Sequence, residues 1–96
     1  INEYIQASTQ KLKKNSIIKS HIHLKNKRTT LSTQEIWIVL RGKLSVKIFD
    51  IDKKQIKSFF LNKGDMYILF KGGHSFKVLK DNTDFYEIKN GPYKKK

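Results

Sequence analysis

Residues 35–49 read EIWIVLRGKLSVKIF, and their composition indicates the fold class of the chain. It is rich in isoleucine, valine and aromatic residues, which fit the pleated surface of a β-sheet. No window of the chain sustains the apolar spacing of a capped amphipathic helix. The Arg41-Gly42 pair interrupts the apolar run, so residues 35–40 and 43–49 are predicted to be the two strands of a hairpin.

The same strand pattern recurs on both sides of this stretch, between segments rich in turn-forming residues. Turns are predicted at residues 13–15, 41–42, 50–53, 63–65 and 81–83. They separate eight short predicted strands: residues 4–12, 16–24, 35–40, 43–49, 55–61, 66–70, 74–79 and 85–89. Regularly spaced short strands are typical of antiparallel sandwiches and barrels. We therefore expect an all-β fold in a single domain that spans residues 1–96.

The chain is strongly basic. Its 96 residues include 21 Lys and Arg but only 8 Asp and Glu, which gives a formal net charge of +13. That charge is compatible with nucleic-acid binding. However, only Arg28 and Arg41 are arginines, the residue whose planar fork suits base recognition. The lysines are spread along the whole chain, with one run at residues 94–96 that is expected to be a solvated end. Nucleic acid is therefore not the expected main partner.

Two absences bear on the compartment. The chain has no cysteine, which is compatible with the reducing cytoplasm. No apolar run approaches the roughly 20 residues that a membrane-spanning helix needs. We therefore expect a cytoplasmic protein without a membrane partner.

Residues 36–40 are apolar on both faces of their predicted strand. Trp37 and Val39 share one face, because alternate residues of a strand point the same way, and Ile36, Ile38 and Leu40 share the other. A strand in a two-sheet sandwich needs only one apolar face. The second face is expected to be covered by the N-terminal segment or by a second subunit, and we favour a homodimer.

Three histidines and one glutamate are the candidate site residues. His21 and His23 share a strand face, with Cα atoms about 6.5–7 Å apart. Glu35 shares the apolar face of Trp37, where a carboxylate is costly to bury unless it is paired or bound to a metal. His74 follows two glycines, which permit a close approach of the backbone. Three imidazoles and one carboxylate can form the first shell of a divalent transition metal ion.

Each of these residues also has a simpler explanation. His21 and His23 fit an exposed polar face, Glu35 fits a strand-edge charge paired with one of many lysines, and His74 fits an ordinary turn position. The spacing of glycines and strands around the set is what favours a metal site.

This spacing resembles the first conserved motif of the cupin family. That motif runs glycine, five residues, His-x-His, a short gap, Glu, six residues, glycine. Asn15 stands where the first glycine would be and is followed by five residues and then by His21-Ile22-His23. Glu35 is followed by six residues and then Gly42, although eleven residues separate His23 from Glu35 instead of the usual three or four.

A second cupin motif is matched further along the chain. It runs glycine, about five residues, Pro-x-Gly, two residues, His, three residues, Asn. Gly64 is followed by DMYIL, and Phe70 replaces the proline. His74 comes one residue early, and Val78 replaces the asparagine. With both motifs in order over residues 15–88, the chain resembles a small single-domain cupin.

The resemblance implies a cupin jelly roll, that is, a double-stranded antiparallel β-helix or small β-barrel. It implies that His21, His23, Glu35 and His74 bind one divalent metal ion, with zinc, manganese, iron and nickel as candidates. The run from residue 64 to residue 93 resembles small bacterial cupins, some labelled mannose-6-phosphate-isomerase-like and others that accompany surface-polysaccharide genes.

The implied function is the binding or conversion of a small polar molecule, with a sugar derivative in polysaccharide metabolism as one candidate. Whether the chain is an enzyme stays open at this point. The alternatives are a non-catalytic module that binds a small ligand, a metal-dependent dioxygenase and, least favoured, a basic nucleic-acid-binding protein.

Overall fold

The computed structural model describes residues 5–92, and the chain divides into two compact units. The first unit is Ile1–Leu31 and the second is Ser32–Lys96. The described residues contain strands and turns but no helix, and thus no long apolar helix of the kind that crosses a membrane. The first residue of the predicted strand 4–12 and the basic run 94–96 lie outside the described residues.

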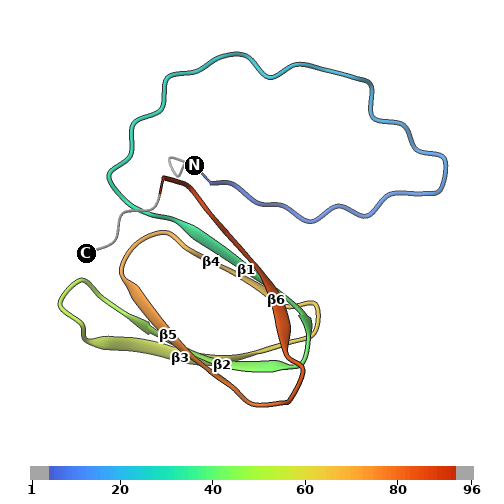
Figure 1. Cartoon of the computed structure of the whole chain (residues 1–96). Coiled ribbons are helices and arrows are strands. Elements are labelled where there is room, and N and C mark those ends of the chain that lie inside the picture. The colour runs from blue at the N-terminus through green and yellow to red at the C-terminus, as the bar shows by residue number, and fades with distance from the viewer. Residues whose placement is uncertain (1–4, 93–96) are drawn as a thin grey trace. The chain divides into compact units, whose positions relative to one another are not determined.

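The second unit consists of two antiparallel sheets that face each other. Its six strands are β1 (Glu35–Arg41), β2 (Lys43–Phe49), β3 (Gln55–Asn62), β4 (Met66–Leu69), β5 (Gly73–Val78) and β6 (Asp84–Lys89). One sheet has the order β4-β1-β6 and the other has the order β3-β2-β5. Figure 1 shows the two groups of strands on opposite sides of the unit. The expectation of an all-β fold is confirmed. Neither sheet is closed on itself, so each keeps two edge strands.

The predicted hairpin between residues 35–40 and 43–49 is wrong. β1 is the central strand of one sheet, whereas β2 is the central strand of the other. Because β1 continues to Arg41, only Gly42 separates the two strands, and a hairpin loop needs at least two residues. Gly42 instead carries the chain from one sheet to the other. Its φ of +93° suits glycine, and a Cβ atom here would lie 2.6 Å from the Cα atom of Thr83.

Three other predicted turns are confirmed. The turn at 50–53 joins β2 and β3, which form the hairpin of this unit, and the carbonyl oxygen of Asp50 accepts a hydrogen bond from the amide of Lys53 (3.0 Å). In the turn at 63–65, the amide of Asp65 donates to the carbonyl oxygen of Asn62 (2.9 Å). Asn82 has a φ of 59° in the turn at 81–83, a left-handed conformation that asparagine tolerates.

The core lies between the two sheets. Its buried members are Trp37, Val39, Leu44, Val46 and Leu61. Trp37 and Val39 come from β1, so the predicted inner face of that strand is confirmed. The alternation of β2 brings Leu44 and Val46 to the same interior from the opposite sheet, and burial of such side chains is the main favourable term in folding.

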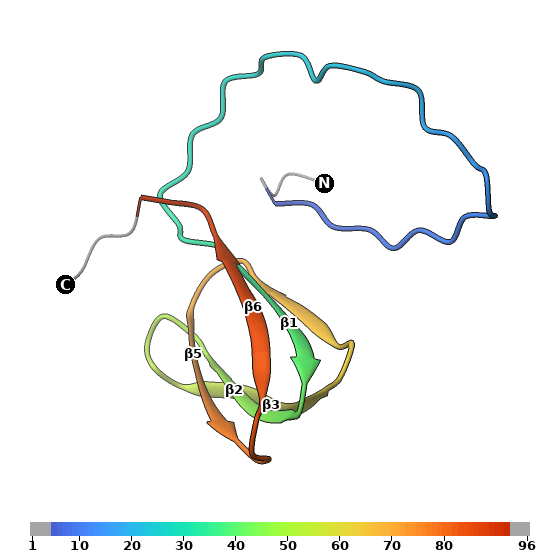
Figure 2. The same ribbon diagram turned by 45° about the vertical axis from the view of Figure 1, so that its right-hand side comes forward.

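The two strands predicted at 4–12 and 16–24 are wrong in the described residues. The chain is irregular from residue 6 to residue 31 apart from one turn, and both ribbon views show it as plain coil (Figure 2). The turn at 13–15 is confirmed, because the amide of Ser16 donates to the carbonyl oxygen of Lys13 (3.1 Å) and Asn15 has a φ of 71°. A strand needs a neighbour that pairs with its amide and carbonyl groups, and the described residues of the first unit contain none.

Candidate metal and ligand site

Glu35 and His74 meet inside the second unit. Glu35 is the first residue of β1, and His74 is the second residue of β5 in the opposite sheet. The Nε2 atom of His74 lies 2.9 Å from the Oε2 atom of Glu35, and the two side chains are only 20% and 13% exposed. Two of the four predicted site residues are therefore brought together in the interior, far apart as they are in the sequence.

Asn90 positions the start of β1, where Glu35 lies. The side-chain Oδ1 atom of Asn90 accepts a hydrogen bond from the amide of Gln34 (2.7 Å), and its Nδ2 atom donates to the carbonyl oxygen of Ser32 (3.2 Å). These bonds hold the segment that enters β1 against the end of β6. Sequence reasoning missed Asn90, whose one signal is its place directly after the last predicted strand.

Gly72 positions the start of β5, where His74 lies. It has a φ of +91°, and a Cβ atom at this position would lie 2.5 Å from the carbonyl oxygen of Phe49. Only glycine allows the chain to pass the backbone of Phe49 this closely. The expectation that the glycines before His74 permit a close approach is confirmed, and the approach sets His74 opposite Ile48 in the register of β2 and β5.

Tyr67 and Trp37 complete the immediate surroundings of His74. The hydroxyl group of Tyr67 is hydrogen-bonded to the Nδ1 atom of His74. The ring of Trp37 lies 4.8 Å from that of His74 and 5.6 Å from that of Tyr67, measured between centroids. Sequence reasoning did not place Tyr67 in the site. Its signal was the alternation in β4, which puts Tyr67 on the inward face with Leu69.

The hydroxyl group of Tyr67 stays protonated at neutral pH. Burial raises the pKa of Tyr67 above its ordinary value, and the negative charges of Glu35 and Glu87 raise it further. A neutral imidazole carries one proton on one of its two nitrogens. If the Nδ1 atom of His74 carries it and donates to Tyr67, the lone pair of Nε2 faces Glu35. Tyr67 thus can fix which nitrogen of His74 is available on the Glu35 side.

Two buried polar atoms next to His74 lack a hydrogen-bond partner within the described part of the chain. They are the Oε2 atom of Glu35 and the Nε1 atom of Trp37. The side chains of Glu35 and His74 therefore lie close together without forming a hydrogen bond. Because an unpaired buried polar group is costly, the interior offers an unfilled acceptor and an unfilled donor to a bound ion or molecule.

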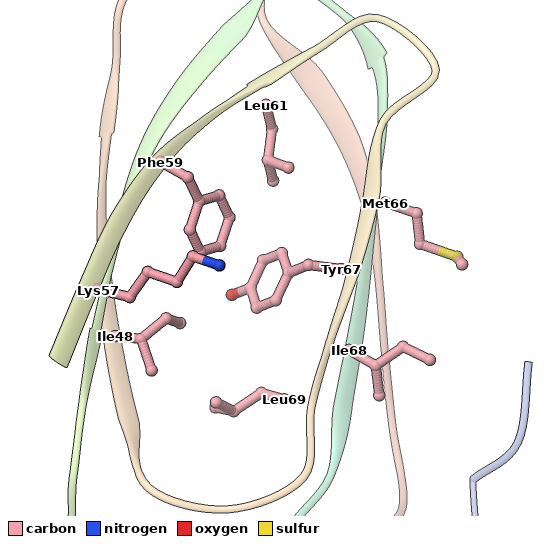
Figure 3. Close-up of a pocket in the computed structure, with 8 residues that line it drawn as sticks. All are labelled: Ile48, Lys57, Phe59, Leu61, Met66, Tyr67, Ile68 and Leu69. Carbon is pink, nitrogen blue, oxygen red and sulfur yellow. The ribbon is translucent and has the colours of Figure 1, made fainter.

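A pocket of about 370 Å³ opens between β3 and β4, the facing edge strands of the two sheets. Its inward walls are mainly Ile48, Phe59, Leu61 and Leu69. Figure 3 shows the side chains of Tyr67 and Lys57 directed into the pocket, whereas Met66 and Ile68 point away from it. A largely apolar pocket with a few convergent polar groups is the usual form of a small-molecule site. Tyr67 contributes to this pocket and also contacts His74.

His21 and His23 lie in the first unit. Their ring centroids are 5.0 Å apart, and the Nδ1 atom of His21 lies 3.0 Å from the carbonyl oxygen of Lys19. The structure thus pairs His21 with His23 and Glu35 with His74. No cluster of three or more His, Cys, Asp or Glu side chains suited to a metal ion occurs within residues 5–92. The four-residue set spans both units and stays a prediction.

Replacing Tyr67 with phenylalanine should remove the last tyrosine to ionise. In an ultraviolet titration of the metal-free protein, one of the four tyrosines should ionise above the ordinary range near pH 10, and the variant should lack this step. Since the pKa of Tyr67 is raised in the folded state, the unfolded chain loses this proton first, and the free energy of unfolding should fall as pH rises above about 10. If the variant ionises like the wild type, Tyr67 is not buried beside Glu35.

The second unit is all-β, and inside it Glu35 and His74, two residue types that commonly bind metal ions, lie together beside a pocket. Comparisons of the chain with protein-family models, with curated proteins and with solved structures find no match. The resemblance to cupins therefore rests on the two motifs in the sequence, and it stays a prediction.

Proposed function

We propose that the second unit binds one divalent transition metal ion at Glu35 and His74 and uses the adjacent pocket to hold a small polar molecule. The observation that carries this proposal is the 2.9 Å approach of His74 Nε2 to a buried Glu35 oxygen that has no hydrogen-bond partner in the described residues. An imidazole nitrogen and a carboxylate oxygen are ligands that suit zinc, manganese, iron and nickel.

The surroundings of His74 support its role as a ligand. Metal-binding histidines usually donate their second ring N–H to a neighbouring oxygen, which fixes the ring and its tautomer. Tyr67 offers such an oxygen to the Nδ1 atom of His74. His21 and His23 are the further ligands that the sequence predicts. A bound ion with an open position would polarise an oxygen of the molecule in the pocket.

The polar groups of the pocket indicate the kind of molecule it holds. The amine of Lys57 suits an anionic or hydroxyl group, and the hydroxyl group of Tyr67 can donate or accept. The apolar walls from Ile48, Phe59 and Leu69 would contact the body of the ligand. A sugar derivative with a charged substituent combines these properties, and it is the ligand that we propose.

Replacing Glu35 with glutamine tests the metal site with little change in shape. We expect the affinity for zinc, measured by titration calorimetry, to fall by more than about 100-fold. Mutation of a residue that only hydrogen-bonds to a metal ligand typically lowers metal affinity by about 10–100-fold, and loss of a ligand itself should lower it further. Glu87→Gln is the matched control, since Glu87 lies opposite Trp37 on the same inner face and its carboxylate pairs with Lys89 (3.6 Å). Equal affinities of the two variants would contradict the proposed site.

We also propose that two copies of the chain associate through the outer face of the sheet β4-β1-β6. This apolar outer face consists of Ile36, Ile38, Leu40, Met66, Ile68, Tyr86 and Ile88. Its residues form cross-strand rows, with Ile38 opposite both Met66 and Tyr86. Met66 is 41% exposed and Tyr86 is 58% exposed, so apolar surface remains open to solvent.

A second copy is the partner that suits this face best. The apolar outer face contains no charged residue, whereas the chain carries a formal net charge of +13. Two identical faces related by a two-fold axis would cover each other without burying a lysine, and so without the cost of desolvating a charge. The sequence of residues 36–40 already led us to expect that a second subunit covers this face. We therefore propose that the protein is a homodimer.

A further inference from the structure

The outer face of the other sheet, β3-β2-β5, has the opposite character. Its outward side chains alternate with the buried Leu44 and Val46. They include Lys43, Ser45, Lys47, Ser58, Phe60, Ser75 and Lys77, which we call the basic face. In the register of the sheet, Phe60, Ser45 and Lys77 form one row, and Ser58, Lys47 and Ser75 form the next.

The basic face has no negative charge to balance its lysines. None of the three strands contains an aspartate or a glutamate. The other sheet, in contrast, contains Glu35, Asp84 and Glu87. Lysines that are scattered in the sequence are therefore gathered by the fold, since Lys43 and Lys47 come from β2 and Lys77 comes from β5. This local excess of positive charge attracts anions.

The basic face is also hollowed, and it exposes an aromatic ring. A depression of about 470 Å³ is lined by residues that include Ser45, Lys47, Phe60 and Lys77. Phe60 is 59% exposed. The amine of Lys43 lies 4.7 Å from the centre of the Phe60 ring, so this ring already accepts a cation on its surface.

We propose that the basic face binds single-stranded nucleic acid without sequence preference. A base stacks on the ring of Phe60, the lysines contact neighbouring phosphates, and the serine hydroxyl groups bond to phosphate or sugar oxygens. A positively charged groove combined with an exposed aromatic side chain is the usual design of proteins that bind single strands. An acidic peptide would use the lysines but has no planar base for Phe60.

The scarcity of arginine agrees with this proposal. Arginine is the residue that reads base edges in the major groove, so its absence from the basic face argues against recognition of a sequence in a duplex. Lysine binds phosphate as a point charge, which suffices for contacts to the backbone of a strand. A duplex would also hide its base surfaces from Phe60.

The test measures the fluorescence anisotropy of labelled oligothymidine and oligouridine of about 12 nucleotides with the full chain, at salt concentrations from about 50 to 200 mM. The triple variant Lys43→Gln, Lys47→Gln, Lys77→Gln should make the negative slope of log affinity against log salt shallower by about 2, since each phosphate contact to a single strand contributes about −0.7. Phe60→Ala should weaken binding by about 5- to 150-fold and leave the slope unchanged.

The controls separate this site from general charge. A triple variant with the same loss of charge, at Lys53, Lys63 and Lys71 in the loops, should bind nearly as well as the wild type. Circular dichroism should show that every variant keeps its strands. Equal weakening by both triple variants, an unaffected Phe60→Ala, tighter binding of a duplex of the same length, or equal competition by polyglutamate would each overturn the proposal.

Discussion

Replacing Gly42 with alanine should destabilise the second unit by about 3 kcal/mol or more. A left-handed conformation costs a residue with a Cβ atom about 1–2 kcal/mol. The new Cβ atom would also lie 2.6 Å from the Cα atom of Thr83. Thr83 cannot easily retreat, because its Oγ1 atom accepts a hydrogen bond from the amide of Lys43 (3.2 Å) and donates to the carbonyl oxygen of Lys80 (2.7 Å).

Gly64→Ala is the matched control for this experiment. Gly64 also has a positive φ, of +86°, but a Cβ atom there would meet nothing within 4 Å, so only the conformational cost of about 1–2 kcal/mol applies. Urea unfolding followed by the fluorescence of Trp37, the single tryptophan and only 2% exposed, gives both free energies. Similar losses for the two variants would contradict the tight corner between β1 and β2.

Replacing Ile38 with lysine should convert the protein from a dimer to a monomer. Ile38 lies at the centre of the apolar outer face, between Met66 and Tyr86. A lysine there would have to bury its charge against the same charge from the second copy, and burial of an unpaired charge is prohibitive. Light scattering at tens of micromolar should give twice the 11.3 kDa chain mass for the wild type and the chain mass for the variant.

Ile56→Lys is the corresponding control. Ile56 is 61% exposed and lies in β3, in the sheet that does not form the proposed interface. This variant should keep the mass of the wild type. A monomeric wild-type protein at the same concentration would contradict the homodimer, and so would a dimer that survives the change at Ile38.

The strands after residue 34 could be predicted from alternation and turn chemistry, which are local properties. Trp37 and Val39 were assigned to the interior on this basis, and the structure confirms them. The pairing of strands could not be predicted this way. The Arg41-Gly42 pair looks like a two-residue hairpin loop in the sequence. In the structure β1 includes Arg41, so Gly42 is the only residue left between β1 and β2. A single residue is too short for a hairpin loop, and the chain passes to the other sheet instead. The N-terminal segment shows the same limit, because alternation cannot supply a partner strand.

The sequence predicted the site only to the extent that strand alternation and turn chemistry assign a residue to one face of its strand or to a turn. Glu35 was expected on the face of Trp37, and His74 was expected at a close approach of the backbone, and the two meet in the interior. The contact of Tyr67 with His74 joins two different sheets, so it depends on topology that periodicity does not contain. The bonds of Asn90 depend on the same topology.

A nitrogen-15 spectrum of the histidine rings during a metal titration tests directly whether His74 binds a metal ion. The chain has only three histidines, and each signal can be assigned from a single His→Ala variant. The Nε2 signal of His74 should shift as zinc is added and stop changing at one ion per chain, and the signals of His21 and His23 should shift in the same titration. A His74 signal that none of zinc, manganese, iron or nickel alters would contradict the metal site between the two sheets.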